Sequence, residues 1–426
     1  MLALIARFRG SAFAKDTAIL TLGTVGAQFL MIASMPVMSR LYSPADFGLL
    51  ALFMAVSSIM ATAVTLRYET AILLPKQEQE SIAIVLLSLV LAISLGTSFG
   101  ITAWLIPGKL KGLLGVSQLR GWLPIAAVAA LASAVVATGT AWLNRQRAYS
   151  AMAQIRILHS AVAVTVGIVL GLTGAAEGLL VAQIVALLVV SGLIIARLSP
   201  LFAHWDHRAV IEAASQHRAA PKFLLPTALL DVVTMQLPVL LITAWFSSES
   251  AGQFNMAWRI LALPMTLIGA AVGQVFFQRF SQAWPDPIAA RSLLVKTWVA
   301  LGLIGFLPTV TLMFLGKPIF MWVLGDAWRE AGIMATIIAP MLLAILISSP
   351  TSTTFLVLGL QKYSLVFGFA FLLYRSGCIY FGALYDKLLL GIGVWVFCEI
   401  IAIISYNFIV LRCITRHEIH RCRDNL

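Results

Sequence analysis

The stretch from Arg40 to Leu52 reads RLYSPADFGLLAL, a short polar turn between two long apolar runs. A similar turn lies near the middle of the chain, where Ala244 to Met256 reads AWFSSESAGQFNM. Each turn contains an aromatic residue, a serine, an acid and then a glycine that opens the next apolar run. The aligned pairs are Tyr42 with Phe246, Ser43 with Ser247 and Gly48 with Gly252. Two such corners predict that one structural unit occurs twice in the chain.

The composition predicts that most of the surface faces lipid. Of the 426 residues, 61% are hydrophobic and 11% are charged, and the mean hydropathy is +0.97. An average soluble domain has about 25% charged residues. Because so apolar a chain cannot cover a water-facing surface with polar atoms, we expect a membrane protein.

Apolar runs of about 18 or more residues are typical of membrane-spanning helices, and we expect about twelve of them. Continuous runs without a period of two exclude a β-barrel, so the predicted fold is an all-α membrane protein. The first run is too long for a cleavable signal, and the segment before it, LALIARFRGSAFAK, is typical of an interfacial helix. The expected spans are approximately Thr17–Leu41, Asp46–Leu66, Ser81–Pro107, Gly121–Leu143, Ile157–Thr173, Ala175–Ala196, Phe223–Phe246, Gly252–Gln278, Leu293–Leu315, Ala331–Leu358, Tyr363–Ala383 and Leu388–Leu411.

The placement of the basic residues predicts the orientation, because Lys and Arg are enriched in short cytoplasmic loops. With the N-terminus inside, about 20 of the basic residues fall on the inner side and about 7 on the outer side. Both termini are therefore expected in the cytoplasm. This arrangement also explains the net charge of +12 without nucleic-acid binding.

The longest polar connection lies at the centre of the twelve expected spans and divides the chain. It contains WDHRAVIEAASQHR, which is typical of an interfacial amphipathic helix. The expected parts are a first six-helix bundle over 1–200, which includes the interfacial N-terminal segment, a cytoplasmic linker over 201–222, a second bundle over 223–411 and a basic tail over 412–426. Since six is even, both bundles enter from the same side, which predicts a pseudo-two-fold axis along the membrane normal and alternating access between the halves.

Helical phase predicts polar faces on three of the spans. Asn255, Arg259 and Gln274 lie on or at the edge of one face of the eighth span, and Thr24 and Gln28 share a face of the first. One face of the seventh carries Thr227, Asp231, Thr234 and Pro238. Such faces are typical of a hydrated cavity wall, although small and hydroxylated residues also mediate helix contacts.

Charged residues inside a bilayer cost about 2.5–3.5 kcal/mol each on insertion scales, so they pair, face the interior or mark function. Arg259 and Arg375 would supply positive charge, and a guanidinium suits phosphate through paired hydrogen bonds. Glu69, Asp231 and Glu399 are candidates for holding a coupling proton or sodium ion, or for neutralising the arginines. The sequence leaves these two roles open.

The same residues carry a resemblance to a known family. The segments SRLYSPADFGLLAL, RYETAILLP (Arg67–Pro75) and LPVLLITAWFSSESAGQFNMAWRILALPMTLIGAAVGQVFFQRF resemble the bacterial polysaccharide biosynthesis proteins of the oligosaccharide flippase type, within the multidrug, oligosaccharidyl-lipid and polysaccharide exporter superfamily. The resemblance implies a carrier that moves undecaprenyl-diphosphate-linked oligosaccharide across the bacterial cytoplasmic (inner) membrane. It implies a role in O-antigen lipopolysaccharide, capsule or exopolysaccharide assembly, with a polysaccharide polymerase and a chain-length regulator as candidate partners. By position it also adds Arg67 and Glu69 to the candidate site.

The alternatives are a multidrug or small-cation exporter of the same architecture and a membrane enzyme. An exporter would favour an acidic, aromatic-lined cavity, whereas basic charge is at least as evident here. An enzyme usually has a large outer loop with catalytic residues, and the longest outer connection contains neither His nor an acid. No phosphate-binding loop motif occurs, and the four cysteines have no metal-ligand spacing. We therefore expect no catalytic residue, no metal and no cofactor.

Overall fold

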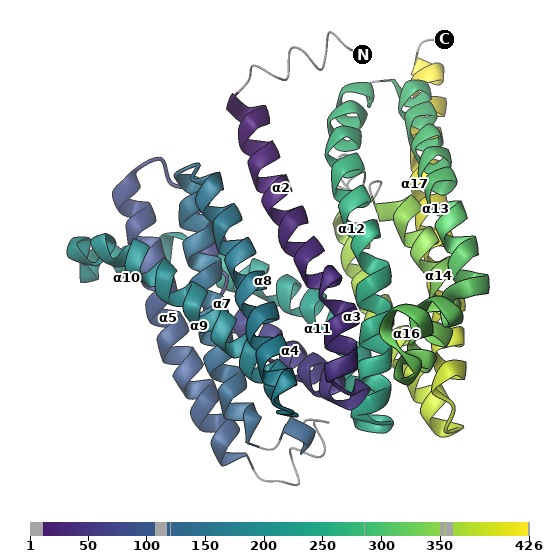
Figure 1. Cartoon of the computed structure of the whole chain (residues 1–426). Coiled ribbons are helices and arrows are strands. Elements are labelled where there is room, and N and C mark those ends of the chain that lie inside the picture. The colour runs from purple at the N-terminus through teal and green to yellow at the C-terminus, as the bar shows by residue number, and fades with distance from the viewer. Residues whose placement is uncertain are drawn as a thin grey trace. The chain divides into compact units, whose positions relative to one another are not determined.

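The computed structural model describes residues 12–106, 117–119, 121–284, 286–349, 354 and 361–424, and these residues form long helices (Figure 1). The chain divides into two compact units, Met1–Ala244 and Trp245–Leu426. The predicted all-helical membrane fold is confirmed. The predicted interfacial segment before the first span lies almost entirely outside the described residues.

In its described residues, the first unit contains seven long helices, shorter helices and the connections between them. The long helices are α2 (Ala12–Ala33), α4 (Pro44–Val64), α5 (Glu78–Leu105), α7 (Trp122–Arg145), α8 (Tyr149–Leu172), α9 (Gly178–Leu198) and α11 (Leu225–Trp245). The short elements are α3 (Met35–Leu41), α10 (His207–Gln216), the 3₁₀ helices η1 (Tyr68–Leu73), η2 (Ser117–Leu119) and η3 (Ser199–His204), and the π-helix η4 (Ala220–Leu224). The predicted amphipathic helix of the linker is α10.

The second unit contains five long helices among its described residues. These are α12 (Ser248–Ala283), α13 (Pro287–Leu324), α14 (Arg329–Ser348), α16 (Gln361–Leu384) and α17 (Leu388–Asp424), with the 3₁₀ helix η5 (Asp326–Trp328) before α14. Helix α17 continues through the predicted last span and most of the predicted tail. Across the described residues of both units, eleven helices are long and apolar enough to cross a membrane. The predicted span Gly252–Gln278 lies in α12, which is not among these eleven, so its crossing stays a prediction.

Two predicted spans differ from the observed helices for identifiable reasons. The first is broken at Ser34, where α2 gives way to α3. Pro36 follows directly, and its missing N–H and fixed φ interrupt a helix. The fifth begins at Tyr149 rather than Ile157. The predicted span is ended at Arg156 because an apolar run is interrupted by a charge. The helix continues through Arg156, because its backbone hydrogen bonds do not depend on the side chain.

The two similar corners have the same local physics. The Ser43 side chain accepts a hydrogen bond from the Asp46 N–H while the Asp46 carboxylate accepts one from the Ser43 N–H, which is a capping box for α4. Ser247 accepts from the Ser250 N–H at 3.0 Å and caps α12. Each serine thus satisfies a free N–H at the start of its helix, α4 for Ser43 and α12 for Ser247.

A tyrosine fixes the first corner against another helix. The Tyr42 hydroxyl donates to the Gly167 carbonyl of α8 at 2.7 Å. Burial, and then the nearby Asp46 carboxylate, raise the pKa of the Tyr42 phenol. The phenol therefore remains protonated and continues to donate at neutral pH.

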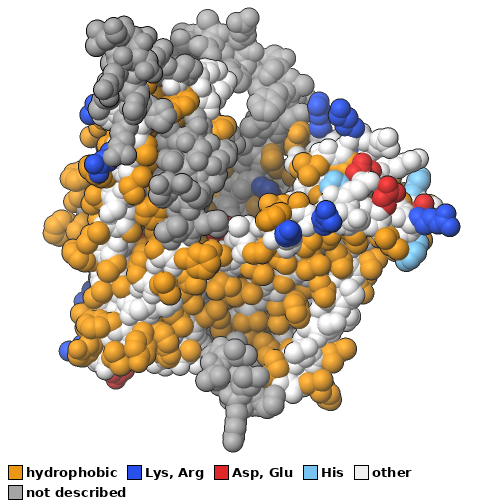
Figure 2. Space-filling view, turned by 180° about the vertical axis from the view of Figure 1, so that it is seen from behind, with side chains coloured by type: hydrophobic (Ala, Val, Ile, Leu, Met, Phe, Trp, Pro, Cys, Tyr) orange, Lys and Arg blue, Asp and Glu red, His pale blue; other side chains and the backbone are white. Residues whose placement is uncertain are grey.

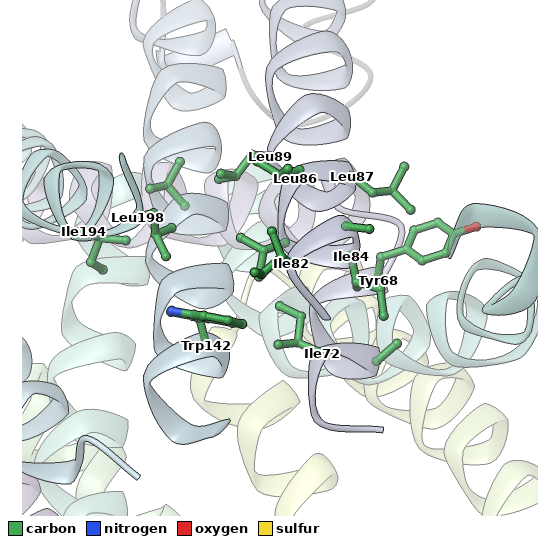
Figure 3. Close-up of a cluster of buried hydrophobic side chains, with 14 of the residues drawn as sticks. Tyr68, Ile72, Ile82, Ile84, Leu86, Leu87, Leu89, Trp142, Ile194 and Leu198 are labelled. Atoms are coloured by element: carbon green, nitrogen blue, oxygen red, sulfur yellow. The ribbon is translucent and has the colours of Figure 1, made fainter. Parts of the chain in front are cut away.

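A compact apolar core joins α5, η1, α7, α9 and α10 at one end of the first unit (Figure 3). Ile72, Ile82 and Trp142 lie close together in Figure 3, while the hydroxyl of Tyr68 points away from them. That hydroxyl donates to the Ala214 carbonyl of α10 at 2.9 Å. The core also includes Ala220, the first residue of η4. It fixes the linker helix and the start of α11 to the rest of the unit.

Candidate functional site

The polar face of α2 meets a cation on α8. Arg156 donates a hydrogen bond from Nη1 to the Thr24 hydroxyl, which in turn donates to the Leu20 carbonyl at 2.8 Å. Gln28, one turn further along α2, is exposed. The structure thus places the Arg156 guanidinium at the predicted polar face of Thr24 and Gln28. The two helices that carry these residues, α2 and α8, are both candidate spans.

Sequence reasoning missed Arg156 because the predicted span began one residue after it. Met152 and Ile155 are buried in the core of the unit, so the apolar period of α8 extends upstream of Ile157. Following that period backwards would have placed Arg156 within the helix. Its side chain would then have counted as a third arginine in a span.

The predicted face of α11 divides into two parts. Thr227 and Asp231 are exposed, whereas Thr234 and Pro238 are buried. Near the buried part, Gln236 donates to the Ser58 hydroxyl of α4 at 2.9 Å. Asp231 is therefore an accessible carboxylate within a candidate span, and a charge in that position is costly unless it meets water or a counter-charge.

Arg259 and Asn255 are half-buried side chains on one face of α12, while Phe254 and Leu261 are buried on the other. The side chain of Gln274 lies outside the described residues. Within the described parts of the chain, neither Arg259 nor Arg156 forms an ion pair. The ion pairs found there join Arg67 with Glu69, His217 with Glu80 and Arg375 with Glu399.

Arg375 and Glu399 form one buried group that links α16 to α17. Arg375 donates from Nε and Nη2 to the two Glu399 oxygens at 2.9 and 2.5 Å. Tyr374 donates to the same carboxylate at 2.5 Å and Trp395 at 2.8 Å. The guanidinium also lies 5.2 Å from the Phe371 ring centroid. Of the two roles that the sequence left open for Glu399, this geometry provides neutralisation of an arginine.

Arg67 and Glu69 lie outside the candidate spans, where α4 has ended and η1 begins. Their side chains pair at 3.1 Å, with Glu69 buried. Leu66 and Arg67 both have positive φ, 50° and 64°. Such a backbone costs about 1–3 kcal/mol per residue and persists where the surroundings enforce it. Among the contacts of the described residues, neither member of the pair bonds to the polar face of α2.

The structure shows what this set of side chains offers chemically. In the first unit, the Thr24 hydroxyl, the Gln28 amide, the exposed Asp231 carboxylate and the Arg156 guanidinium lie on candidate spans, and Arg156 has no ion pair to any described residue. In the second unit, the Asn255 amide and the Arg259 guanidinium lie on a predicted span, and Arg259 likewise has no ion pair among the described residues. In the portions described, no three His, Cys, Asp or Glu side chains lie close enough together to hold a metal ion. Each unit, taken by itself, provides hydrogen-bond donors and a positive charge that suit a polar, anionic group.

Comparison with known proteins identifies related sequences. The family model described as "Polysaccharide biosynthesis protein" matches residues 37–333. The chain is also similar to the "Succinoglycan biosynthesis transport protein ExoT" of Rhizobium meliloti (strain 1021), with 23% identity over 92% of this chain and 78% of that protein.

Solved structures share the fold. A multidrug resistance transporter of the MATE family and the MOP superfamily, in an inward-facing conformation, has a TM-score of 0.72 at 17% identity, over 91% of this chain and 95% of that one. The lipid II flippase MurJ, in an inward closed conformation, has a TM-score of 0.68 at 14% identity, over 93% and 89%. These likenesses show that the chain has the helical fold of membrane transporters.

Proposed function

Because the chain belongs to the polysaccharide biosynthesis protein family, we infer that it is a flippase for undecaprenyl-diphosphate-linked oligosaccharide. It moves this lipid across the bacterial cytoplasmic membrane by alternating access, with both termini in the cytoplasm. The protein performs no bond-making chemistry and delivers the glycan for O-antigen, capsule or exopolysaccharide assembly. A polymerase and a chain-length regulator are the partners that would use its product.

The observation that carries this proposal is one arginine in each unit, Arg156 on α8 of the first and Arg259 on α12 of the second. A cation in a span is costly without a counter-charge. Since no carboxylate neutralises either one among the described residues, the diphosphate of the lipid is a suitable partner. A guanidinium presents its donors in a fixed fork that matches phosphate oxygens.

Polar groups on the helices that carry these arginines, and on α2, suit the glycan. Gln28 and Asn255 present amides, and Thr24 presents a hydroxyl. Amides and hydroxyls both donate and accept, as sugar hydroxyls do. The polyprenyl chain needs no such site because it remains soluble in the bilayer while the polar head crosses.

The test is substitution of Arg259 in a strain that depends on this protein for its surface polysaccharide. Arg259→Ala should abolish the polysaccharide and trap undecaprenyl-linked oligosaccharide on the inner face, with a normal amount of protein in the membrane. Arg279→Ala, an exposed residue of the same helix, is the matched control and should leave both readouts unchanged. Normal polysaccharide in Arg259→Ala would remove Arg259 from the site.

The same strain separates the flippase from the exporter. Deletion of the gene should trap lipid-linked oligosaccharide if the protein is a flippase. An exporter would instead leave the lipid pool unchanged and make the deletion strain accumulate cationic dyes. That second pattern would overturn the proposed function.

A further inference from the structure

The linker between α9 and α11 forms a basic pocket at the edge of the membrane. Its lining residues are Arg218, Ala219, Pro221, Lys222 and Phe223, and its volume is about 670 Å³. These residues straddle Ala220, where a candidate span begins. The pocket therefore lies where the protein leaves the hydrocarbon region, whichever side of the membrane that is.

The pocket belongs to a rigid part of the first unit. Ala220 is 3% exposed and packs in the core that contains Tyr68 and Ile72. The backbone here forms the π-helix η4, in which the Leu225 N–H bonds to the Ala220 carbonyl. Pro221 has no N–H to donate, so the normal helical pattern is interrupted at this point. Single π-turns are frequent at functional sites.

Neither of the two cationic side chains of the pocket forms an ion pair with a described residue. Arg218 and Lys222 are exposed and form no ion pair with any described residue. Glu80 lies 3.0 Å from the His217 ring and Glu212 accepts from Gln216 at 3.0 Å, and neither of these acids pairs with Arg218 or Lys222. Two unneutralised cations in one pocket attract an anion from outside the protein.

Exposed apolar side chains surround the same pocket. Phe223 is 60% exposed and its ring lies 5.2 Å from the Lys222 ammonium. Leu224, the next residue along the chain, is also exposed, and aromatic residues such as Phe223 are enriched at the headgroup level of membranes. Figure 2 shows charged and His side chains gathered along one border of the hydrophobic surface, at the end of the first unit where α10 lies in Figure 1. An anion with an attached hydrocarbon chain fits this combination better than a soluble one.

We propose that this pocket captures the diphosphate of a polyprenyl diphosphate-linked lipid in the cytoplasmic leaflet, before the lipid reaches the spans. The proposal rests on the proposed flippase function for the side of the membrane and for the class of lipid. The two cations match the two phosphates. The Arg218 guanidinium donates paired hydrogen bonds to one phosphate, and the Lys222 ammonium binds the other. Phe223 and Leu224 contact the first isoprene units.

Protection of Lys222 from an amine-acetylating reagent tests the pocket directly. The full-length protein is placed in phosphatidylcholine vesicles that contain increasing fractions of undecaprenyl diphosphate, and acetylation is measured by peptide mass spectrometry. Lys222 should be protected, while Lys387, an exposed residue between α16 and α17, should not. Arg218→Gln should raise the lipid fraction for half-protection about fivefold, since a basic residue near an anionic surface contributes about 1 kcal/mol. Arg208→Gln changes an exposed residue of α10 outside the pocket, and it should leave the lipid fraction for half-protection unchanged.

Three results would overturn the proposal: absence of protection, equal protection in Arg218→Gln and wild type, or equal protection by phosphatidylglycerol at the same charge density. The last would mean a general anionic-lipid surface. Failure of the proposed function has a different signature. If wild-type protein in the same vesicles protects Lys222 but does not translocate lipid-linked oligosaccharide, the pocket stands and the flippase function falls. Translocation without protection would mean that the flippase function stands and the pocket falls.

Discussion

Arg375 of α16 and Glu399 of α17 hold each other by two hydrogen bonds, at 2.9 and 2.5 Å. Tyr374 and Trp395 donate two more to the same carboxylate. Glu399 is 2% exposed, so donors from the protein and not from water satisfy its charge. These donors come from α16 and from α17 itself. A carboxylate held in this way stabilises the contact between α16 and α17, and both of its oxygens accept hydrogen bonds from the protein.

Removal of one member of this pair should destabilise the second unit. Glu399→Gln leaves the Arg375 guanidinium buried without a counter-charge, and breaking a buried ion pair costs about 3–5 kcal/mol. The thermal unfolding midpoint in detergent should fall clearly. The double variant Arg375→Met with Glu399→Leu removes both charges, and such replacements are often neutral. A double variant as unstable as Glu399→Gln would contradict this account.

Arg156 should be needed for translocation and not for folding. Its guanidinium bonds to the Thr24 hydroxyl and to no described acid, so Arg156→Gln leaves no buried carboxylate unpaired. We expect surface polysaccharide to fall at least about tenfold with a normal amount of protein. The reason is that loss of the charged hydrogen bond between Arg156 and the lipid diphosphate costs about 1.5–3 kcal/mol. Arg156→Lys keeps the charge and should restore part of the activity. Equal loss in Arg156→Gln and Arg156→Lys would show that charge is not what matters there.

Asp231 is the strongest of the three candidates for ion coupling. Glu399 is held by four donors, and Glu69 pairs with Arg67 outside the spans. Asp231 alone of these three is exposed, and it forms no ion pair with the described residues. If a proton gradient drives transport, Asp231→Asn should make the translocation rate in vesicles the same with and without a gradient. Asp386→Asn, an exposed acid at a positive φ that Asn tolerates, is the control. A gradient effect that survives in Asp231→Asn would exclude this role.

Properties that depend on local sequence were predictable. The apolar runs located the helices, and the serine and acid of each corner indicated helix starts because an N-cap needs an oxygen to accept a free N–H. Ser43 and Ser247 both perform this role. The amphipathic pattern of the linker likewise indicated α10. In each case the residues that decide the structure lie close together along the chain.

Properties that depend on pairing between helices were not predictable. The sequence left open whether Glu399 holds a coupling ion or neutralises an arginine, and it did not identify Arg375 as the partner, because the two meet through the rotation of α16 and α17 about their axes. A single sequence does not specify which residues of one helix face which residues of another. The contact of Arg156 with Thr24 was missed for the same reason, and because the charge itself was used to end the predicted span.

Close approach of α2 and α8 is what allows Thr24 to reach Arg156. A Cβ atom on Gly23 would clash with the Ala153 Cβ and lie 2.9 Å from its Cα. Gly23→Ala should therefore force the two helices apart at this point and separate the side chains of Thr24 and Arg156. We expect a lower thermal midpoint and reduced polysaccharide, since overpacking typically costs about 1–3 kcal/mol.

Two further variants on these helices show whether the contact is the cause. The double variant Gly23→Ala with Ala153→Gly removes the closer clash and should recover part of both losses. Gly26→Ala, which meets no atom within 4 Å, is the matched control on the same helix and should behave as wild type. If Gly26→Ala is as damaging as Gly23→Ala, the effect does not come from the contact between α2 and α8.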